Sequence, residues 1–269
     1  MLNYSIKNYI KSIVTAIGIY EPLKYSYIFR IYTRLFKPEL HEHHLKEVNF
    51  YRSFLQPSNL IFDIGAYDGH KTEAFLYLAN KVVSCEPDKK NLQTLQTRFR
   101  RFKKRVFIEP VAIGSSATEQ TIFIHKAGSA FNTLSEKFKN VLEEDSNKNW
   151  NEDIVFTKQE IVKVETLDNL IKKHGTPNFI KIDIEGYELE AIKGLHTKVP
   201  FISIECTFPQ FESELQEIQQ LLEKRFTNIS YNIAIDEKLL LSSFVNKDTL
   251  NQIIYKYNIK LFETIIKTT

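Results

Sequence analysis

The chain has 269 residues, of which 43% are hydrophobic and 26% are charged, and its formal net charge is +3. These values are typical of a soluble globular protein with one domain of about 200 residues plus additions, and the small charge argues against nucleic-acid binding. No apolar run, residues 13–20 included, reaches the roughly 18 residues needed to span a bilayer. Two cysteines, Cys85 and Cys206, do not make a disulfide framework, so we expect a cytoplasmic protein with reduced thiols.

Residues 1–56 are expected to be helical, because apolar and aromatic residues recur there at helical spacing with Lys and Arg between them. Two interpretations are open. A basic amphipathic helix can lie on an anionic membrane, whereas a helical cap would pack on the following domain; we favour the cap. His41, His43 and His44 follow Pro38 without a further ligand at matching spacing, so a surface loop or helix start is favoured over a metal site.

The most informative stretch is residues 60–69. An apolar strand ends in Asp63, Gly65 and Gly69 bracket a short turn, and a helical pattern follows over residues 71–80. This order of strand, glycine turn and helix is typical of a cofactor-binding loop at the carboxyl edge of a parallel sheet. Gly65 lets the backbone approach a ligand, and Asp63 can accept a hydrogen bond. Dinucleotide folds use Gly-x-Gly-x-x-Gly, so the observed Asp-x-Gly-x-x-x-Gly spacing disfavours them.

A second strand over residues 81–88 contains Glu86 and Pro87 near its end, and a helix is predicted over residues 88–102. An acid at this place, roughly 20 residues beyond the glycine loop, can accept hydrogen bonds from two ribose hydroxyls. Glu86 is therefore predicted to bind the ribose of a cofactor. The alternative is that it caps the next helix.

Residues 106–113 and 120–125 are predicted strands. Residues 126–160 have no regular pattern and include an acidic, Asn-rich run that holds Trp150. This insertion is either a lid or substrate loop, or a mobile surface loop, and both interpretations stay open.

The second informative stretch is residues 178–188, a buried strand that ends in Asp183 and Glu185, with a helix after the following glycine. In a doubly wound sheet, strand ends near the switch point line one crevice, so Asp183 is expected to face the ligand. Glu185 would share its side if the chain stayed extended. The predicted strand over residues 201–206 brings Glu205 to the same edge.

The other elements complete an α/β pattern: a strand over 161–164, helices over 166–175 and 212–225, and an antiparallel pair of strands over 229–235 and 239–244. Residues 247–269 are predicted to form a peripheral helix. The chain therefore divides into a cap (1–56), a cofactor-binding domain (57–246) that contains the 126–160 insertion, and a C-terminal helix (247–269).

Together these motifs resemble the FkbM-type family of class I S-adenosylmethionine (SAM) methyltransferases, over roughly residues 58–206. The chain departs from the family pattern at Tyr67 and at Glu109-Pro110, where Asn is often found. The residues that carry the resemblance are Asp63-Ile-Gly65-Ala66-Tyr67-Asp68-Gly69, Cys85-Glu86-Pro87, Val111-Ala112-Ile113-Gly114, Val164-Glu165-Thr166-Leu167-Asp168 and Lys181-Ile182-Asp183-Ile184-Glu185-Gly186.

The resemblance implies a Rossmann-like class I fold, with a seven-stranded, mostly parallel sheet and helices on both faces. It implies SAM as the cofactor and no metal. It also implies methylation of a hydroxyl, since family members act on sugars, glycans and secondary-metabolite scaffolds; the partner would be a small-molecule or glycan acceptor. Carried over by motif, the cofactor-binding residues are Asp63, Gly65, Ala66, Tyr67, Asp68, Gly69, Thr72, Glu86, Pro87 and Ala112.

Methyl transfer to a hydroxyl needs alignment of donor and acceptor and removal of the hydroxyl proton. Asp183 and Glu185 are the candidate bases, because a carboxylate near the positive sulfonium stays ionised. Lys181 could orient an acid or the acceptor oxygen, or be a surface lysine. Glu205 could be a base, a hydrogen-bond partner of a sugar hydroxyl, or structural. The oligomeric state stays open.

Three other functions compete with this one. An amino-methyltransferase of nucleic acids is disfavoured, because the Asn/Asp-Pro-Pro-aromatic strand end is missing. An NAD-dependent oxidoreductase is disfavoured by the Gly65–Gly69 spacing. A catalytically degenerate SAM-binding interaction protein is the third alternative, and the intact set of Asp63, Gly65, Glu86 and Asp183 disfavours it.

Overall fold

The computed structural model describes residues 25, 36, 38–145 and 154–268. Most of the predicted cap lies outside these residues, as does the middle of the 126–160 insertion. Helix α4 (Pro38–Arg52) is described, and the three histidines lie in its first half, where a helix start was one of the two expectations. None of the helices in the described ranges is long and apolar enough to cross a membrane.

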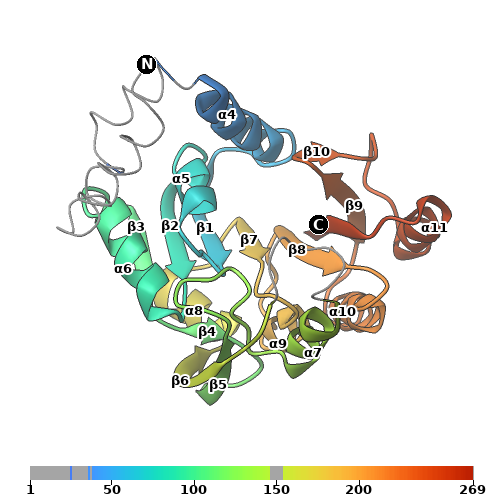
Figure 1. Ribbon diagram of the computed structural model, residues 1–269. Helices are drawn as coiled ribbons and strands as arrows, with labels where there is room; N and C mark the ends of the chain where they lie inside the picture. The colour runs from blue at the N-terminus through green and yellow to red at the C-terminus, as the bar shows by residue number, and fades with distance from the viewer. Residues whose placement is uncertain (1–24, 26–35, 37, 146–153, 269) are drawn as a thin grey trace.

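Strands and helices alternate along the chain, as Figure 1 shows. The strands are β1 (Ser58–Ile64), β2 (Ala79–Cys85), β3 (Val106–Glu109), β4 (Ala112–Ile113), β5 (Thr118–Ile124), β6 (Lys158–Glu165), β7 (Phe179–Ile182), β8 (Phe201–Thr207), β9 (Ile229–Ile235), β10 (Lys238–Leu239) and β11 (Leu261–Thr268). The helices after α4 are α5 (His70–Phe75), α6 (Lys89–Arg98), α7 (Glu136–Asp145), α8 (Leu167–His174), α9 (Glu188–Lys193), α10 (Glu212–Arg225) and α11 (Lys247–Tyr257).

The main sheet has eight strands in the order β10-β9-β11-β8-β7-β1-β2-β3. The run from β8 to β3 is parallel, and β11 pairs antiparallel with both β8 and β9. The strand order reverses between β1 and β7, so their carboxyl ends meet at a switch point, where folds of this type bind ligands. The predicted Rossmann-like sheet is confirmed in type, but it has eight strands rather than seven because the short strand β10 extends one edge.

Two predicted strands are wrong in extent. Residues 106–113 are divided between β3 in the main sheet and β4 in a separate three-stranded sheet with β6 and β5. Pro110 lies between them and lacks the N–H that a continuous ladder requires. The strand predicted over residues 239–244 is reduced to β10, because the Asn232 side-chain amide bonds the Leu241 backbone at 2.9 and 3.2 Å in place of a second strand.

The C-terminal segment also differs from the prediction. The expected peripheral helix over residues 247–269 ends at Tyr257, and Asn258 closes it in the left-handed conformation, with φ 48°. Residues 261–268 then form β11, which lies in the interior of the main sheet. The strand forms because it pairs with β8 and β9, which are both distant from it in sequence. The local sequence pattern does not predict such pairing.

Helices cover both faces of the main sheet (Figure 1). On one face α4, α5 and α6 pack around a core that includes Tyr51 and Ile61, and on the other α8 to α11 pack around a core that includes Phe62. Neighbouring strand residues fall in different cores because successive side chains point to opposite faces. With both faces covered, the carboxyl edge of the sheet is left for a binding site.

Candidate active site

The glycine loop after β1 is held against two neighbouring strands. The N–H groups of Gly65 and Ala66 both donate to the Cys85 carbonyl oxygen at the end of β2, at 3.1 and 3.0 Å. A Cβ at Gly65 would lie 1.7 Å from the Asp183 carbonyl oxygen just beyond β7, and Gly65 has φ +82°. Only glycine tolerates both the contact and the angle, so the loop is fixed where β1, β2 and β7 end.

Asp63 and Thr72 brace this loop from inside the protein. Both side chains are buried; Thr72 Oγ1 donates to Asp63 Oδ2 at 2.5 Å and lies 2.8 Å from Ser84 Oγ. Burial raises the pKa of Asp63, although the charge of Lys181 and the hydrogen bond from Thr72 oppose the shift. Both residues were predicted to bind cofactor, but they lie beneath the wall of the cavity described below.

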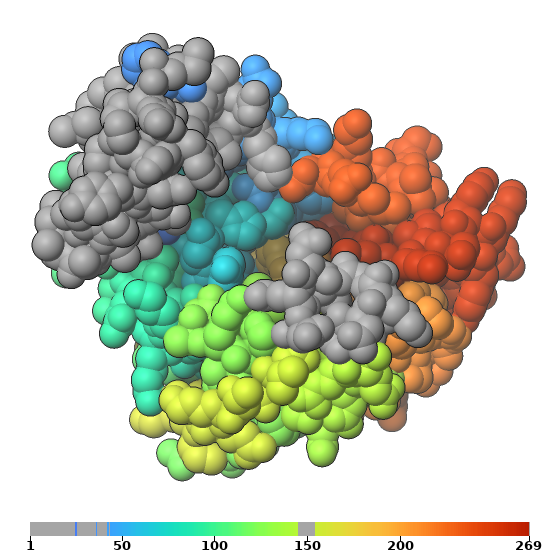
Figure 2. All heavy atoms as spheres, in the orientation of Figure 1, coloured from blue at the N-terminus to red at the C-terminus, as the bar shows by residue number. Residues whose placement is uncertain are grey.

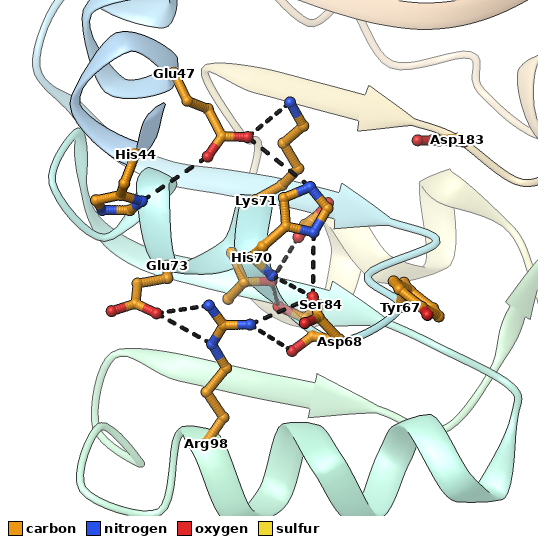
Figure 3. A network of polar contacts seen from close by, with 12 residues as sticks. His44, Glu47, Tyr67, Asp68, His70, Lys71, Glu73, Ser84, Arg98 and Asp183 are labelled. Atoms are coloured by element: carbon orange, nitrogen blue, oxygen red, sulfur yellow. Dashed lines mark hydrogen bonds and ion pairs between the residues drawn. The ribbon is translucent and has the colours of Figure 1, made fainter. Parts of the chain in front are cut away.

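Asp68 and Gly69 anchor α5 to its neighbours instead of facing the cavity. Asp68 accepts a hydrogen bond from the His70 N–H at 3.0 Å and lies 3.3 Å from Arg98 Nη1 (Figure 3). Although burial opposes the shift, hydrogen bonds from His70 and the charge of Arg98 lower the pKa of Asp68 to about 2. A Cβ at Gly69 would lie 2.6 Å from the Phe99 ring, so this glycine lets α6 pack closely.

A cavity of about 280 Å³ opens at the carboxyl ends of β1, β2 and β7. Figure 2 shows a hollow near the middle of the face it displays. The predicted site residues on the cavity wall are Gly65, Ala66, Tyr67, Glu86, Pro87, Ala112, Lys181, Asp183 and Glu185. The sequence analysis did not single out several further residues of the wall, among them His70, Lys71, Asn91, Ile122 and Tyr187.

Glu86 lies on this wall with both carboxylate oxygens already engaged. Its Oε2 accepts the Tyr67 N–H at 2.9 Å, and its Oε1 accepts the Asp88 N–H at 2.8 Å. Burial raises the pKa of Glu86 to about 7. Each carboxylate oxygen can accept a second hydrogen bond, so Glu86 can hold both the glycine loop and a pair of ribose hydroxyls.

Lys181, which is buried, and Asp183, whose side chain is 29% exposed, form an ion pair at the end of β7. Lys181 is 2% exposed, and its Nζ lies 2.6 Å from Asp183 Oδ2. Burial by itself would raise the pKa of Asp183, but the Lys181 charge outweighs it and the pKa is lowered. Asp183 is therefore ionised at the cavity wall, and Lys181 is no surface lysine.

Glu185 and Glu205 complete a group of three carboxylates with Asp183, whose nearest oxygens all lie within 4.8 Å of one another. The charge of Asp183, together with burial, raises the pKa of Glu205 to about 8. Burial, and to a smaller extent the charge of Asp183, also raises the pKa of Glu185. Glu205 lies behind the main cavity, on a small pocket that shares Glu185 with it. Among the described residues this is the one group with an arrangement that could hold a metal ion.

Glu188 holds the turn that presents these acids, and the sequence analysis missed this role. Its Oε1 accepts the N–H groups of Ile184 at 3.0 Å and Gly186 at 3.2 Å. Glu185 has φ 57°, in the left-handed region that L-residues rarely adopt, and Thr133 Oγ1 donates to its carbonyl oxygen at 2.7 Å. An acid two residues after a glycine, in the first turn of a helix, was the available signal.

The first part of the 126–160 insertion forms one wall of the cavity. Asp88 Oδ2 accepts hydrogen bonds from the Gly128 N–H at 3.3 Å and from Asn132 Nδ2 at 3.0 Å. The segment is thereby tied to the end of β2, and through Thr133 it is tied to the turn after β7. Five residues of this segment line the cavity: Ser129, Ala130, Asn132, Thr133 and Leu134.

Comparison with known families supplies the decisive observation. A family model for the methyltransferase FkbM domain matches residues 63–228, more than half of the chain. The chain belongs to the FkbM methyltransferase family. A search of curated proteins by sequence found no match.

Solved structures similar to this FkbM methyltransferase have low identity to it. An FkbM methyltransferase from Methylobacillus flagellatus is 18% identical over 78% of this chain, with a TM-score of 0.46, and the match covers 44% of that protein. A Streptococcus mutans protein in complex with S-adenosylhomocysteine is 11% identical over 82% of this chain and 95% of its own, with a TM-score of 0.41. A TehB-like SAM-dependent methyltransferase from Corynebacterium glutamicum is 10% identical over 83% and 88%, also with a TM-score of 0.41.

SAM is the cofactor of this family, and the cavity of this FkbM methyltransferase fits the molecule. Glu86 would hold the ribose hydroxyls, and the apolar wall around Ile113 and Ile122 suits the adenine ring. Gly65, which leaves no Cβ in the way, and the ionised Asp183 would receive the methionine part. The fit rests on donor, acceptor and apolar groups that the structure places on one wall.

Proposed function

We propose that this FkbM methyltransferase transfers the methyl group of SAM to a hydroxyl of a sugar, a glycan or a secondary-metabolite scaffold. The observation that carries the proposal is the Asp183 carboxylate, ionised beside the Lys181 ammonium on the cavity wall next to the glycine loop. A hydroxyl is a weak nucleophile until a base withdraws its proton. An ionised carboxylate beside the methyl donor supplies that base.

In the proposed reaction, bound SAM supplies a methyl group on a positively charged sulfur. The acceptor oxygen bonds to the methyl carbon, the carbon–sulfur bond breaks to leave a thioether, and Asp183 takes the hydroxyl proton. Lys181 keeps Asp183 ionised and fixes its direction. Glu185, on the cavity wall, is available to bond further hydroxyls of the acceptor. Glu205 lies behind the wall and supports Asp183 by a hydrogen bond.

Fewer alternative functions now remain. An NAD-dependent oxidoreductase is not retained, since the chain belongs to a methyltransferase family. A SAM-binding protein without catalytic activity is the remaining competitor. The Lys181–Asp183 pair supports catalysis instead, because it places an ionised carboxylate that can withdraw a proton on the cavity wall.

The test is transfer of radiolabelled methyl from SAM to a panel of neutral sugars, uronic acids and glycans. We expect the label in an alkali-stable ether linkage. Asp183→Asn should lower the transfer rate by at least about 100-fold, because a general base contributes at least that factor. Asp248→Asn, on the exposed side of α11, is the matched control and should keep full activity. SAM binding without transfer to any hydroxyl, or full activity of Asp183→Asn, would overturn the proposal.

A further inference from the structure

The methionine part of SAM is a zwitterion, with an ammonium and a carboxylate on one carbon. A site for it must offer groups of both signs close together. The acids of the cavity wall, Asp183 and Glu185 among them, suit the ammonium and the sulfonium. The carboxylate needs a cation or N–H donors. The described part of the wall carries three side chains able to serve as that cation, His70, Lys71 and Lys181.

All three side chains have an acidic partner, but Lys181 is buried against Asp183 and His70 is a cation only when protonated. Lys181 is 2% exposed and lies 2.6 Å from the Asp183 carboxylate, so its ammonium is committed to that acid. His70 Nδ1 lies 3.1 Å from Asp68 Oδ1, which turns the ring toward the glycine loop's own acid (Figure 3). Lys71 remains, in the first turn of α5 directly after the loop.

Helix α4 orients Lys71. The Lys71 Nζ lies 2.7 Å from Oε1 of Glu47, a residue of α4 that is only 2% exposed. The same Nζ lies 3.8 Å from Oε1 of Glu237, in the turn between β9 and β10. The ammonium also lies 5.8 Å from the centre of the Tyr51 ring, within cation–π range. Figure 3 shows Glu47 of α4 reaching down to Lys71. An ammonium has three N–H donors, and Glu237 at 3.8 Å is beyond hydrogen-bond distance, so Lys71 keeps donors for a ligand beside its contact with Glu47.

Lys71 and Asp183 both line the cavity. The Lys71 charge helps to lower the pKa of Asp183, after the larger effect of Lys181, so the two groups are close enough to interact. Each has its own counter-ion, Glu47 for Lys71 and Lys181 for Asp183. The cavity thus has, in Lys71, an oriented cation that can pair with the carboxylate of an amino-acid zwitterion.

We propose that Lys71, oriented by Glu47, binds the α-carboxylate of the methionine part of SAM, so that helix α4 builds one end of the cofactor site. This inference rests on SAM as the cofactor and is independent of which acceptor is methylated. It gives the last part of the predicted cap a role in cofactor recognition.

The test is calorimetric titration with two ligands that differ only in the group at issue, SAM and decarboxylated SAM. We expect the natural protein to bind SAM about 10- to 100-fold more tightly, the usual value of a hydrogen bond between charged groups. Lys71→Met should weaken SAM binding by that factor and leave the binding of decarboxylated SAM within about twofold. Glu47→Gln, which removes the orienting charge, should lower the preference partially.

The matched control is Lys89→Met, which removes an exposed lysine paired with Glu160 away from the cavity and should leave both affinities unchanged. Binding of decarboxylated SAM also reports that a variant is folded, and Lys71→Gln replaces Lys71→Met if the latter does not fold. Equal weakening of both ligands, or of neither, overturns the proposal in favour of a structural lysine or of backbone N–H donors. Failure to find a hydroxyl acceptor would overturn the proposed function and leave this inference intact.

Discussion

Replacement of Lys181 by Met should destabilise the protein by about 3–5 kcal/mol, the usual cost of removing one partner of a buried ion pair. Lys181 is 2% exposed and lies 2.6 Å from Asp183 Oδ2. Burial by itself would lower the pKa of Lys181, yet the charges of Asp183, Glu263 and Glu205 raise it. The ammonium is thus the shared counter-ion of several acids, and its loss leaves them without compensation.

Urea unfolding followed by circular dichroism measures the change, which corresponds to a fall of about 2–4 °C in Tm per kcal/mol for a chain of this size. Lys181→Met/Asp183→Asn should be more stable than Lys181→Met, because the unpaired buried charge is then removed as well. Lys89→Met, at an exposed ion pair with Glu160, should change stability by less than about 1 kcal/mol. A Lys181→Met protein as stable as the natural one would refute the reasoning.

Two further predictions follow from the glycine loop and from Glu86. Gly65→Ala places a Cβ 1.7 Å from the Asp183 carbonyl oxygen and should weaken SAM binding in calorimetry by more than about tenfold. Gly175→Ala is the control, because Gly175 also has a positive φ but no atom nearer than 3.9 Å to the added Cβ, so it tests backbone strain without a clash. Equal SAM affinities in the two variants would contradict the prediction. The pKa of Glu86 rises from 4.5 to about 7 on folding, so its contribution to stability is fully present below pH 4.5 and is lost as the pH rises to 7. Glu86→Gln should therefore flatten the fall in unfolding free energy over that interval by roughly 3 kcal/mol, and an unchanged slope in urea titrations would count against the assignment.

The elements predicted most accurately have local signals at their ends. Helix α10 has the predicted bounds, Glu212–Arg225, with acidic residues in its first turn and basic ones in its last, although no side chain caps its N-terminus. Helix α8 is preceded by Thr166, whose side chain accepts the Asn169 N–H, and followed by Gly175 with φ 98°. Capping residues act on their own turn of backbone, so the chain carries this information within a few residues.

The candidate site was predicted in part for the same reason. Glu86 and Asp183 lie on the cavity wall because acids that follow parallel strands meet at one edge of the sheet. Asp63, read the same way, is buried under the loop, since Thr72 and Ser84 take up its side chain. No spacing along the chain distinguishes an acid that faces the cavity from one that braces it.

By itself, the sequence determined the alternation of strands and helices, the glycine loop, and the strand-end acids that identify a methyltransferase-type crevice, because each depends on residues close together in the chain. Tertiary structure decided what distant segments do to one another. It placed β11 between β8 and β9, set Glu47 of α4 against Lys71, and brought Asp183, Glu185 and Glu205 within 4.8 Å. These contacts change pKa values and fix side-chain directions, and both depend on distances in space that the order of residues does not contain.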